Sequence, residues 1–258
     1  QGHAGLARTI ADLDRVGIAH AGAASEPGAA YASAVLARGG LRVAIVSVAE
    51  ALNHHPRAHE GEPSMTVARL EPEERVVEAL RAARERADVV VLTVHWMRDF
   101  AEGPGSTYRR LAERFVEAGA DVLVGAGPHV IHPGVRMQSA RGDAVVAYSL
   151  GNLVSGMGHG YRVGHDVPPS LHPANVRPEA RDAVLLRVPI TLVAGRIAIA
   201  ALTAVPFWTR NDLALAEREH RAGGVALVAL ADADAEERDE RRPVIAGSIG
   251  DAVTLVDR

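Results

Sequence analysis

Apolar runs alternate with segments of helical periodicity along the first 150 residues of the chain. Uniformly apolar stretches lie within 41–49, 89–100 and 119–135, and such runs are typical of strands buried on both faces of a parallel sheet. Pro72 opens a helical segment that has acidic residues in its first turn and arginine in its last, which suits the helix dipole. A second helical segment, 107–118, separates the last two strands. The order strand, helix, strand predicts a β-α-β unit with parallel strands.

Glycine pairs and polar turns between apolar runs predict hairpins elsewhere in the chain. Further elements follow from periodicity, among them a helix over 6–15 that ends at Gly17 and a solvated helix face in the mixed-charge segment AEERDERR. The hairpin turns are expected at Gly39 and Gly40, at Arg141 and Gly142, and at Ala194 and Gly195 within 183–205, and short strands are expected at 18–21 and 252–256.

Two segments show no periodicity. Residues 50–65 form a polar loop that carries Asn53, His54, His55 and His59, and 155–181 is a long Gly/Pro/His stretch. A loop as long as the second one is usually a functional lid or disordered. No repeat or linker divides the chain, so the prediction is one domain over 1–258, with a motif-bearing part at 1–154 and a loop with C-terminal strands at 155–258.

Composition narrows the class of protein. The chain has 258 residues, 48% of them hydrophobic, which is ample for a core. Its 28 basic and 32 acidic residues give a net charge of −4, which argues against nucleic acid or an anionic membrane as the partner. Cysteine is absent, which excludes disulfides and thiolate metal sites. Arg187, Pro189 and Gly195 interrupt the most apolar region, so no membrane span is expected within the chain.

Two histidines follow neighbouring predicted strands. His95 ends one strand, and His129 stands in Gly-Ala-Gly-Pro-His after the next. Adjacent parallel strands lie about 4.8 Å apart, and chemistry collects at their carboxyl ends, so both imidazoles are expected to point into one pocket. Imidazole is the commonest nitrogen ligand of Zn, Mn or Fe. The alternative is that each is a hydrogen-bonded structural residue.

Other polar residues near these strand ends have two interpretations each. Asp99 and His132 are candidate catalytic residues. Asp99 could also be a metal ligand, a carboxylate that orients an imidazole, or a surface charge, and His132 could reach the same cavity as His129 or face solvent. Asn152 in YSLGN could bind substrate or metal, or cap a turn. Ser149 lacks the Gly-x-Ser-x-Gly elbow of a nucleophile. His159, His165 and His172 have no metal-ligand spacing and are expected to be solvated.

Three blocks in this order, TVHWMRDF, GADVLVGAGPHVIHPGV and VVAYSLGNLV, resemble the signature blocks of the CapA family of bacterial capsule-synthesis proteins. The resemblance covers roughly 1–154. It implies a calcineurin-like metallophosphoesterase α/β fold, an α-β-β-α sandwich, and a role in poly-γ-glutamate capsule formation at the cell envelope. It also implies a divalent metal (Mn, Fe or Zn), with two ions in the intact family site.

The resemblance implies a role for each matching residue. His95 and His129 match metal ligands, Asp99 stands where the family usually has Glu, and His132 stands where Gln is common. Trp96, Ser149 and Asn152 are the substrate-binding candidates. Met97 replaces the usual Gly, and Ala126 replaces a histidine. Alanine cannot bind a metal, so one ligand is lost unless His132 substitutes for it.

The family's Asp, Asn-x-Glu and Asn-Asn-His motifs would precede Gln1. We therefore expect the chain to be a fragment that lacks N-terminal strands, exposes a raw sheet edge and cannot hold a dinuclear centre by itself.

Two functions follow from this interpretation. The first is a metal-dependent hydrolase acting on a small phosphoester or on the amide bonds of an anionic polymer. The second is a non-catalytic capsule-assembly or polymer-binding protein with a degenerate metal site, which the loss of a ligand at Ala126 favours. Other capsule-synthesis proteins are candidate partners, and enzymatic activity stays uncertain at this point.

Overall fold

The computed structural model describes residues 2–52, 65–161, 163 and 172–258. The predicted polar loop with Asn53, His54, His55 and His59, and His165 in the second loop, lie outside these residues. Among the described residues, the strands form a large mixed sheet, a smaller mixed sheet and a two-stranded ribbon. The expected mixed α/β fold is confirmed.

The large sheet carries the predicted parallel strands. Its order is β10-β11-β8-β6-β5-β3-β2, with β7 pairing β8, and β3, β5, β6 and β8 run parallel to one another. The β5-α3-β6 unit is therefore confirmed as a parallel crossover. The bounds are β2 Ala34–Arg38, β3 Leu41–Ala49, β5 Val89–His95, β6 Val122–Ala126, β7 Ile131–Ser139, β8 Gly142–Leu150, β10 Ile190–Val193 and β11 Arg196–Ile199.

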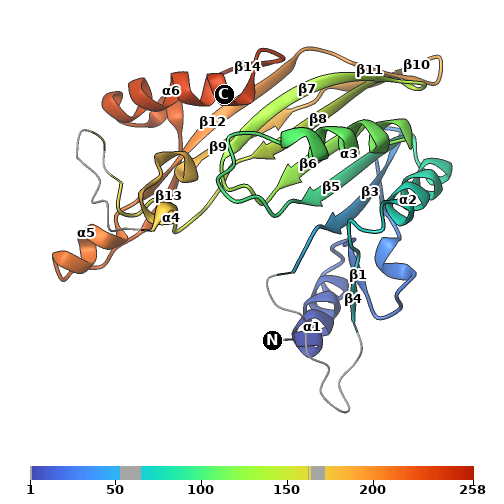
Figure 1. Cartoon of the computed structure of the whole chain (residues 1–258), viewed down its shortest axis with the longest axis horizontal. Helices are drawn as coiled ribbons and strands as arrows, with labels where there is room; N and C mark the ends of the chain where they lie inside the picture. Colours follow the sequence, from blue (N-terminus) through green and yellow to red (C-terminus); the bar gives the residue numbers. More distant parts are fainter. Residues whose placement is uncertain (1, 53–64, 162, 164–171) are drawn as a thin grey trace.

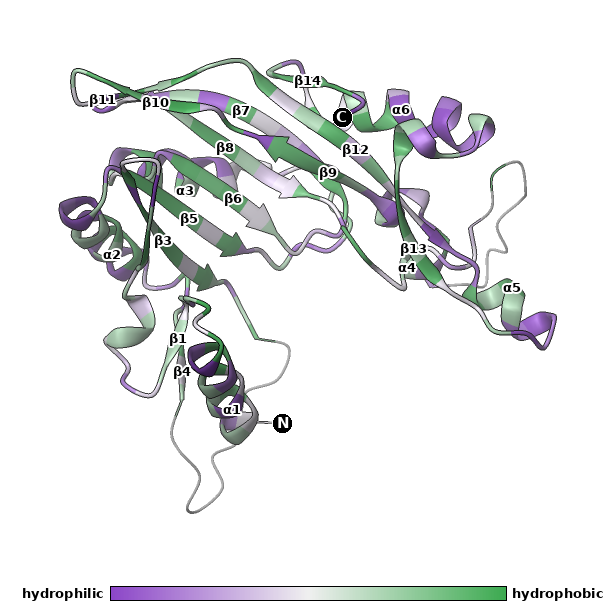
Figure 2. Ribbon diagram, turned by 180° about the vertical axis from the view of Figure 1, so that it is seen from behind, coloured by the Kyte–Doolittle hydropathy of each residue, from purple (hydrophilic) through white to green (hydrophobic). Residues whose placement is uncertain are grey.

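The large sheet separates two apolar cores. The helices α2 (Glu73–Arg86) and α3 (Gly105–Glu117) pack on one face of the large sheet through residues such as Leu80 and Phe115. The opposite face contributes Val89 and Val145 to a second core. Figure 1 shows α3 and α2 over the strands, and the reverse view in Figure 2 shows β3, β5 and β6 without a described helix in front of them.

The smaller sheet completes the second core together with α6 (Ala235–Ile249). The turn at Ala194 and Gly195 joins β10 and β11 as predicted. The outer arms of that segment, however, leave the large sheet. The smaller sheet consists of β9 Asp182–Arg187, β12 Leu202–Asn211, β13 Val225–Ala229 and β14 Val253–Leu255.

Short elements complete the structure. The predicted strand at 18–21 is wrong, because the nearest strand, β1 (Ala23–Ala24), instead pairs with β4 (Thr66–Val67). The helix at the start is α1 (Gly2–Arg15). The others are η1 Ala29–Tyr31, α4 Pro173–Val176, η2 Pro178–Arg181, α5 Leu213–Arg218 and η3 Leu230–Asp232. None of the helices in the described ranges has the length and apolar character needed to cross a membrane.

Candidate functional site

The candidate site lies at the carboxyl edge of the parallel strands, where β5 and β6 end side by side. His95 is in register with Ala126 in this parallel pair, and the Trp96 amide donates to the Ala126 carbonyl at 2.8 Å. His95 is exposed to solvent. The sequence pattern therefore placed the two strand ends correctly, and the residue beside His95 is the alanine at which the expected ligand is missing.

The loop after β6 holds His129 in an uncommon backbone conformation. His129 has a φ of 61°, in the left-handed region that costs free energy for residues other than glycine. The Phe100 amide donates to the Pro128 carbonyl at 2.8 Å, and a side chain at Gly127 would overlap the Trp96 carbonyl. The loops that follow β5 and β6 are thus packed directly against each other.

His129 is oriented by Asn152, which follows β8. The imidazole Nδ1 lies 2.9 Å from Asn152 Oδ1, while Asn152 Nδ2 donates to the Ala180 carbonyl at 2.9 Å. That second bond fixes which end of the amide is oxygen, so Nδ1 carries the proton and donates. In this tautomer the lone pair lies on Nε2, which makes no described hydrogen bond. Metal-binding histidines are held in this way by a partner on the other nitrogen.

A shallow cavity of about 480 Å³ covers the open face of these strands and reaches His95. Ser47, Thr93, Val124 and Ala126 line it, and His129 does not. Within the described part of the chain, no contact joins the imidazoles of His95 and His129. That they face one pocket stays a prediction.

Two of the expected substrate-binding side chains are buried. Trp96 has no exposed surface, donates from Nε1 to the Tyr148 carbonyl at 3.1 Å, and stacks on Tyr108 with ring centroids 4.3 Å apart. Ser149 is 1% exposed. Both side chains are enclosed in this structure, and their role in substrate binding stays a prediction. Asn152 is partly accessible, and its side chain bonds to His129, to the Ala180 carbonyl and to Met157 Sδ.

The two candidate catalytic residues lie in opposite environments. His132 is 2% exposed, and its Nε2 lies 2.7 Å from the Ala101 carbonyl. Burial lowers the pKa of His132, so its imidazole is neutral, and Nδ1 has no hydrogen-bond partner in the described structure. Asp99 is exposed, and no ion pair with another described residue holds it. The structure does not bring Asp99 and His132 into contact.

Glu50 is a residue of this edge that the sequence analysis did not single out. It follows β3, and its Oε2 accepts from the Met97 amide at 2.9 Å and from the Tyr108 hydroxyl at 2.6 Å. Burial, together with Glu50, raises the pKa of Tyr108 to about 12. Glu50 therefore fixes the backbone just after His95. Its position after a buried strand was the signal that could have identified it.

The C-terminal third also supports the site. The Asn152 amide donates to the Asp182 carbonyl at 3.0 Å, and the Asp182 carboxylate accepts from Arg241 Nη2 at 2.6 Å. Both side chains of that ion pair are 3% exposed. Burial raises the pKa of Asp182 to about 7 in spite of Arg241. Thus α6, through Arg241, anchors the backbone that holds Asn152.

The side chains at this edge are of the types that bind a divalent metal, but there are fewer of them than a metal site needs. Among the described residues there is no group of three or more His, Asp or Glu side chains arranged to hold an ion, whereas catalytic zinc sites use three protein ligands. His95 and His129 would supply two, and only His129 has its second nitrogen held by a described partner.

Comparison with known proteins gives a match over the same part of the chain. The model of the family described as bacterial capsule synthesis protein PGA_cap matches residues 1–157. The chain is 38% identical over 76 residues to the PGA biosynthesis protein CapA of Bacillus subtilis (strain 168), and 36% identical over 72 residues to the capsule biosynthesis protein CapA of Bacillus anthracis. These stretches cover 30% and 28% of this chain, but only 19% and 16% of the two relatives.

Similar solved structures are more distant. A novel phosphatase from Mycoplasma pneumoniae aligns with a TM-score of 0.40 at 13% identity, covering 67% of this chain and 56% of its own. A putative 5'-nucleotidase from Staphylococcus aureus aligns with a TM-score of 0.40 at 12% identity, covering 73% of this chain and 32% of its own. A hypothetical protein from Thermus thermophilus has a TM-score of 0.36 at 17% identity, covering 67% of this chain and 60% of its own.

Proposed function

The chain belongs to the bacterial capsule synthesis protein family PGA_cap, and from that membership we propose that it serves capsule biosynthesis through a hydrolase-type metal site at the carboxyl edge of β5, β6 and β8. The observation that supports this most is the bond from His129 Nδ1 to Asn152 Oδ1. This bond orients the ring and leaves Nε2 of His129 as the nitrogen that can bind a metal.

In this proposal the substrate is a phosphoester or an amide bond of an anionic polymer such as poly-γ-glutamate. A divalent metal (Mn, Fe or Zn), when bound, would supply Lewis-acid activation of water and of the scissile group. His95 and His129 would hold it, and Asn152 would fix the ring of His129. Asp99, exposed on the loop between them, would be the carboxylate available to a substrate that approaches from solvent.

A second candidate function is non-catalytic capsule assembly or polymer binding. Ala126 favours it, because this alanine is exposed in register with His95, where a third imidazole would complete a ligand set. A protein of this kind would bind the polymer with the same affinity whether or not metal is present.

Metal analysis of the full-length protein separates the two. We expect His95→Ala and His129→Ala each to lower the affinity for Mn²⁺ or Zn²⁺ at least tenfold, and Asn152→Leu to lower it by about 10–100-fold because the ring of His129 loses the partner that orients it. His172→Ala is the matched control, because His172 is exposed and the described hydrogen bond of its side chain goes to the nearby Ala174 amide. Unchanged metal content in both strand-end variants, with polymer binding retained, would establish the non-catalytic function instead.

A further inference from the structure

A second cavity, of about 480 Å³, lies between β12, α6 and Tyr161, and neither His95 nor His129 lines it. All of its lining residues come after residue 157, where the family match ends. Its inner wall contains Tyr161, Arg181 and Trp208, and its rim contains Arg210, Asp212, Asp234, Glu236 and Glu237.

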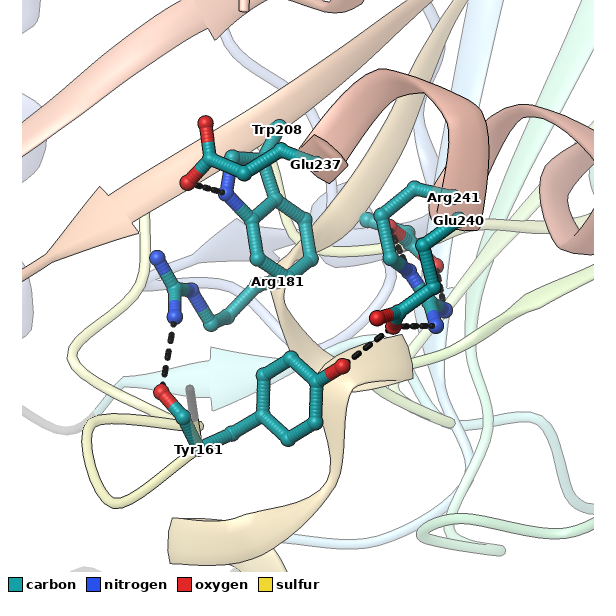
Figure 3. Close-up of polar contacts among 7 residues, drawn as sticks. Tyr161, Arg181, Trp208, Glu237, Glu240 and Arg241 are labelled. Carbon is teal, nitrogen blue, oxygen red and sulfur yellow. Dashed lines mark hydrogen bonds and ion pairs between the residues drawn. The ribbon is translucent and has the colours of Figure 1, made fainter. Parts of the chain in front are cut away.

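Arg181 is held rigidly at the base of this cavity. Its side chain is nearly buried, with 5% of the residue exposed. Nε donates to the Thr209 carbonyl at 2.6 Å, and Nη1 donates to the Tyr161 carbonyl at 3.3 Å. The guanidinium carbon lies 4.1 Å from the centre of the Trp208 ring, a cation–π distance. Figure 3 shows the guanidinium beside this ring, with one nitrogen bonded to Tyr161.

The charge of Arg181 has no carboxylate partner among the described residues. The nearby carboxylates are bonded to other donors: Glu237 accepts from Trp208 Nε1 at 2.9 Å and from Arg210, and Asp182 accepts from Arg241. Arg181 Nη2 makes no described hydrogen bond, and this nitrogen is not fully enclosed by protein. A buried cation without a counter-ion is costly, so this nitrogen is a ready donor to an anion that enters the cavity.

The rim restricts which anion can enter. Asp212 is paired with Arg221 at 2.7 Å, and Asp234 with Arg210 at 2.9 Å, whereas Glu236 has no described ion pair and is exposed. A ligand with a second negative charge would meet these carboxylates at the mouth, and a ligand with an ammonium group would be attracted to them.

We propose that this cavity binds a small monocarboxylate whose far end is neutral or positively charged, with its carboxylate on the Nη1–Nη2 edge of Arg181. Guanidinium and carboxylate are complementary planar groups, and Val163 and Leu215 give the cavity an apolar wall for the ligand body. Burial lowers the pKa of Arg181 to about 10, so the guanidinium still carries its charge at neutral pH. This inference does not depend on the proposed hydrolase site.

Calorimetric titration of the protein with four ligands that share a four-carbon chain tests whether the charges at the two ends of the ligand decide binding. We expect 4-aminobutyrate to bind at least as tightly as butyrate, succinate to bind at least tenfold more weakly than butyrate, and butylamine not to bind. Succinate that binds as tightly as butyrate would contradict the rim argument, and butylamine that binds best would overturn the proposal.

Variants test the site itself. Arg181→Met keeps a similar apolar stem without the charge, and we expect it to abolish binding of butyrate. Arg187→Met is the control, because Arg187 is exposed on the neighbouring strand β9 and we expect it to leave binding unchanged. Glu236→Gln should reduce both the advantage of 4-aminobutyrate over butyrate and the penalty on succinate, because Glu236 is the rim carboxylate without a described ion pair.

A second readout keeps the test valid if Arg181→Met does not fold. The chain has two tryptophans, and only Trp208 touches Arg181, so butyrate should shift the indole N–H resonance of Trp208 and leave that of Trp96 in place. Binding that shifts neither resonance, or that persists in a folded Arg181→Met variant, would overturn the proposal.

Discussion

At the end of β5, one step along the backbone separates an exposed side chain from a buried one. His95 faces solvent, while Trp96 has no exposed surface and packs on Tyr108. Side chains alternate between the two faces of a strand, so the same alternation that presents the histidine directs the tryptophan into the core under α3. A motif that contains both residues therefore combines one residue available for chemistry with one that supports it.

The role of Trp96 can be tested by its effect on stability. We expect Trp96→Ala to lower the free energy of unfolding by about 3–5 kcal/mol, as large-to-small changes in a core do, since it also leaves the Tyr148 carbonyl without its donor. Urea denaturation measures this. Met97→Ala, at an exposed neighbour, should change stability by less than about 0.5 kcal/mol. A Trp96→Ala protein of unchanged stability with weakened substrate binding would instead support the predicted substrate-binding role of Trp96.

At the scale of elements, the junction of β8 with β11 depends on a glycine. Gly142 begins β8 with a φ of 117°, and it is paired with Ile197 of β11. The Ile197 amide donates to the Arg141 carbonyl at 2.8 Å, and a side chain at Gly142 would overlap the Ile197 carbonyl. This close approach ties the β10-β11 hairpin to the edge of the parallel sheet.

We expect Gly142→Ala to destabilise the protein by about 1–3 kcal/mol more than Gly195→Ala, because both backbones are strained by a side chain but only Gly142 lacks space. Gly195 also has a positive φ, of 75°, with nothing within 4 Å of its missing side chain. Thermal or urea unfolding of the two variants makes the comparison. Equal losses would show that backbone strain alone accounts for the effect.

At the scale of the whole molecule, the buried Asp182–Arg241 pair joins β9 to α6 across 59 positions of sequence. Asp182 also accepts from the Asn152 amide through its carbonyl, so the C-terminal helix, the smaller sheet and the strand-end site share one network. Such pairs are costly to desolvate, and they are most damaging when one partner is removed.

The raised pKa of Asp182, about 7, predicts a pH dependence. As pH rises from about 4 to about 7, the unfolded chain loses the proton of Asp182 while the folded chain keeps it, so the free energy of unfolding falls. We expect Asp182→Asn to remove this contribution. Urea midpoints at about pH 4.5 and about pH 7 would show a greater decline in the parent than in the variant. Parallel declines would contradict the raised pKa.

Local sequence patterns were sufficient to predict most of the helices, strands and turns. The turn at Gly39 and Gly40, the helix after Pro72 and the β5-α3-β6 crossover are confirmed. Each depends on side-chain periodicity or on the backbone freedom of a few consecutive residues. The PGA_cap family likewise follows from motifs within 1–157. The single-domain prediction and the roles of His95 and His129 as metal ligands stay predictions.

Only the tertiary structure decided which side chains meet. The pairing of His129 with Asn152, the burial of His132 and the exposure of Ala126 beside His95 depend on strand register. The segment around Ala194 folds as the predicted turn, yet its outer arms join a different sheet. The reason is physical: propensity acts over a few neighbouring residues, whereas burial and hydrogen bonding across the sheet are set by residues tens of positions apart, which no local pattern encodes.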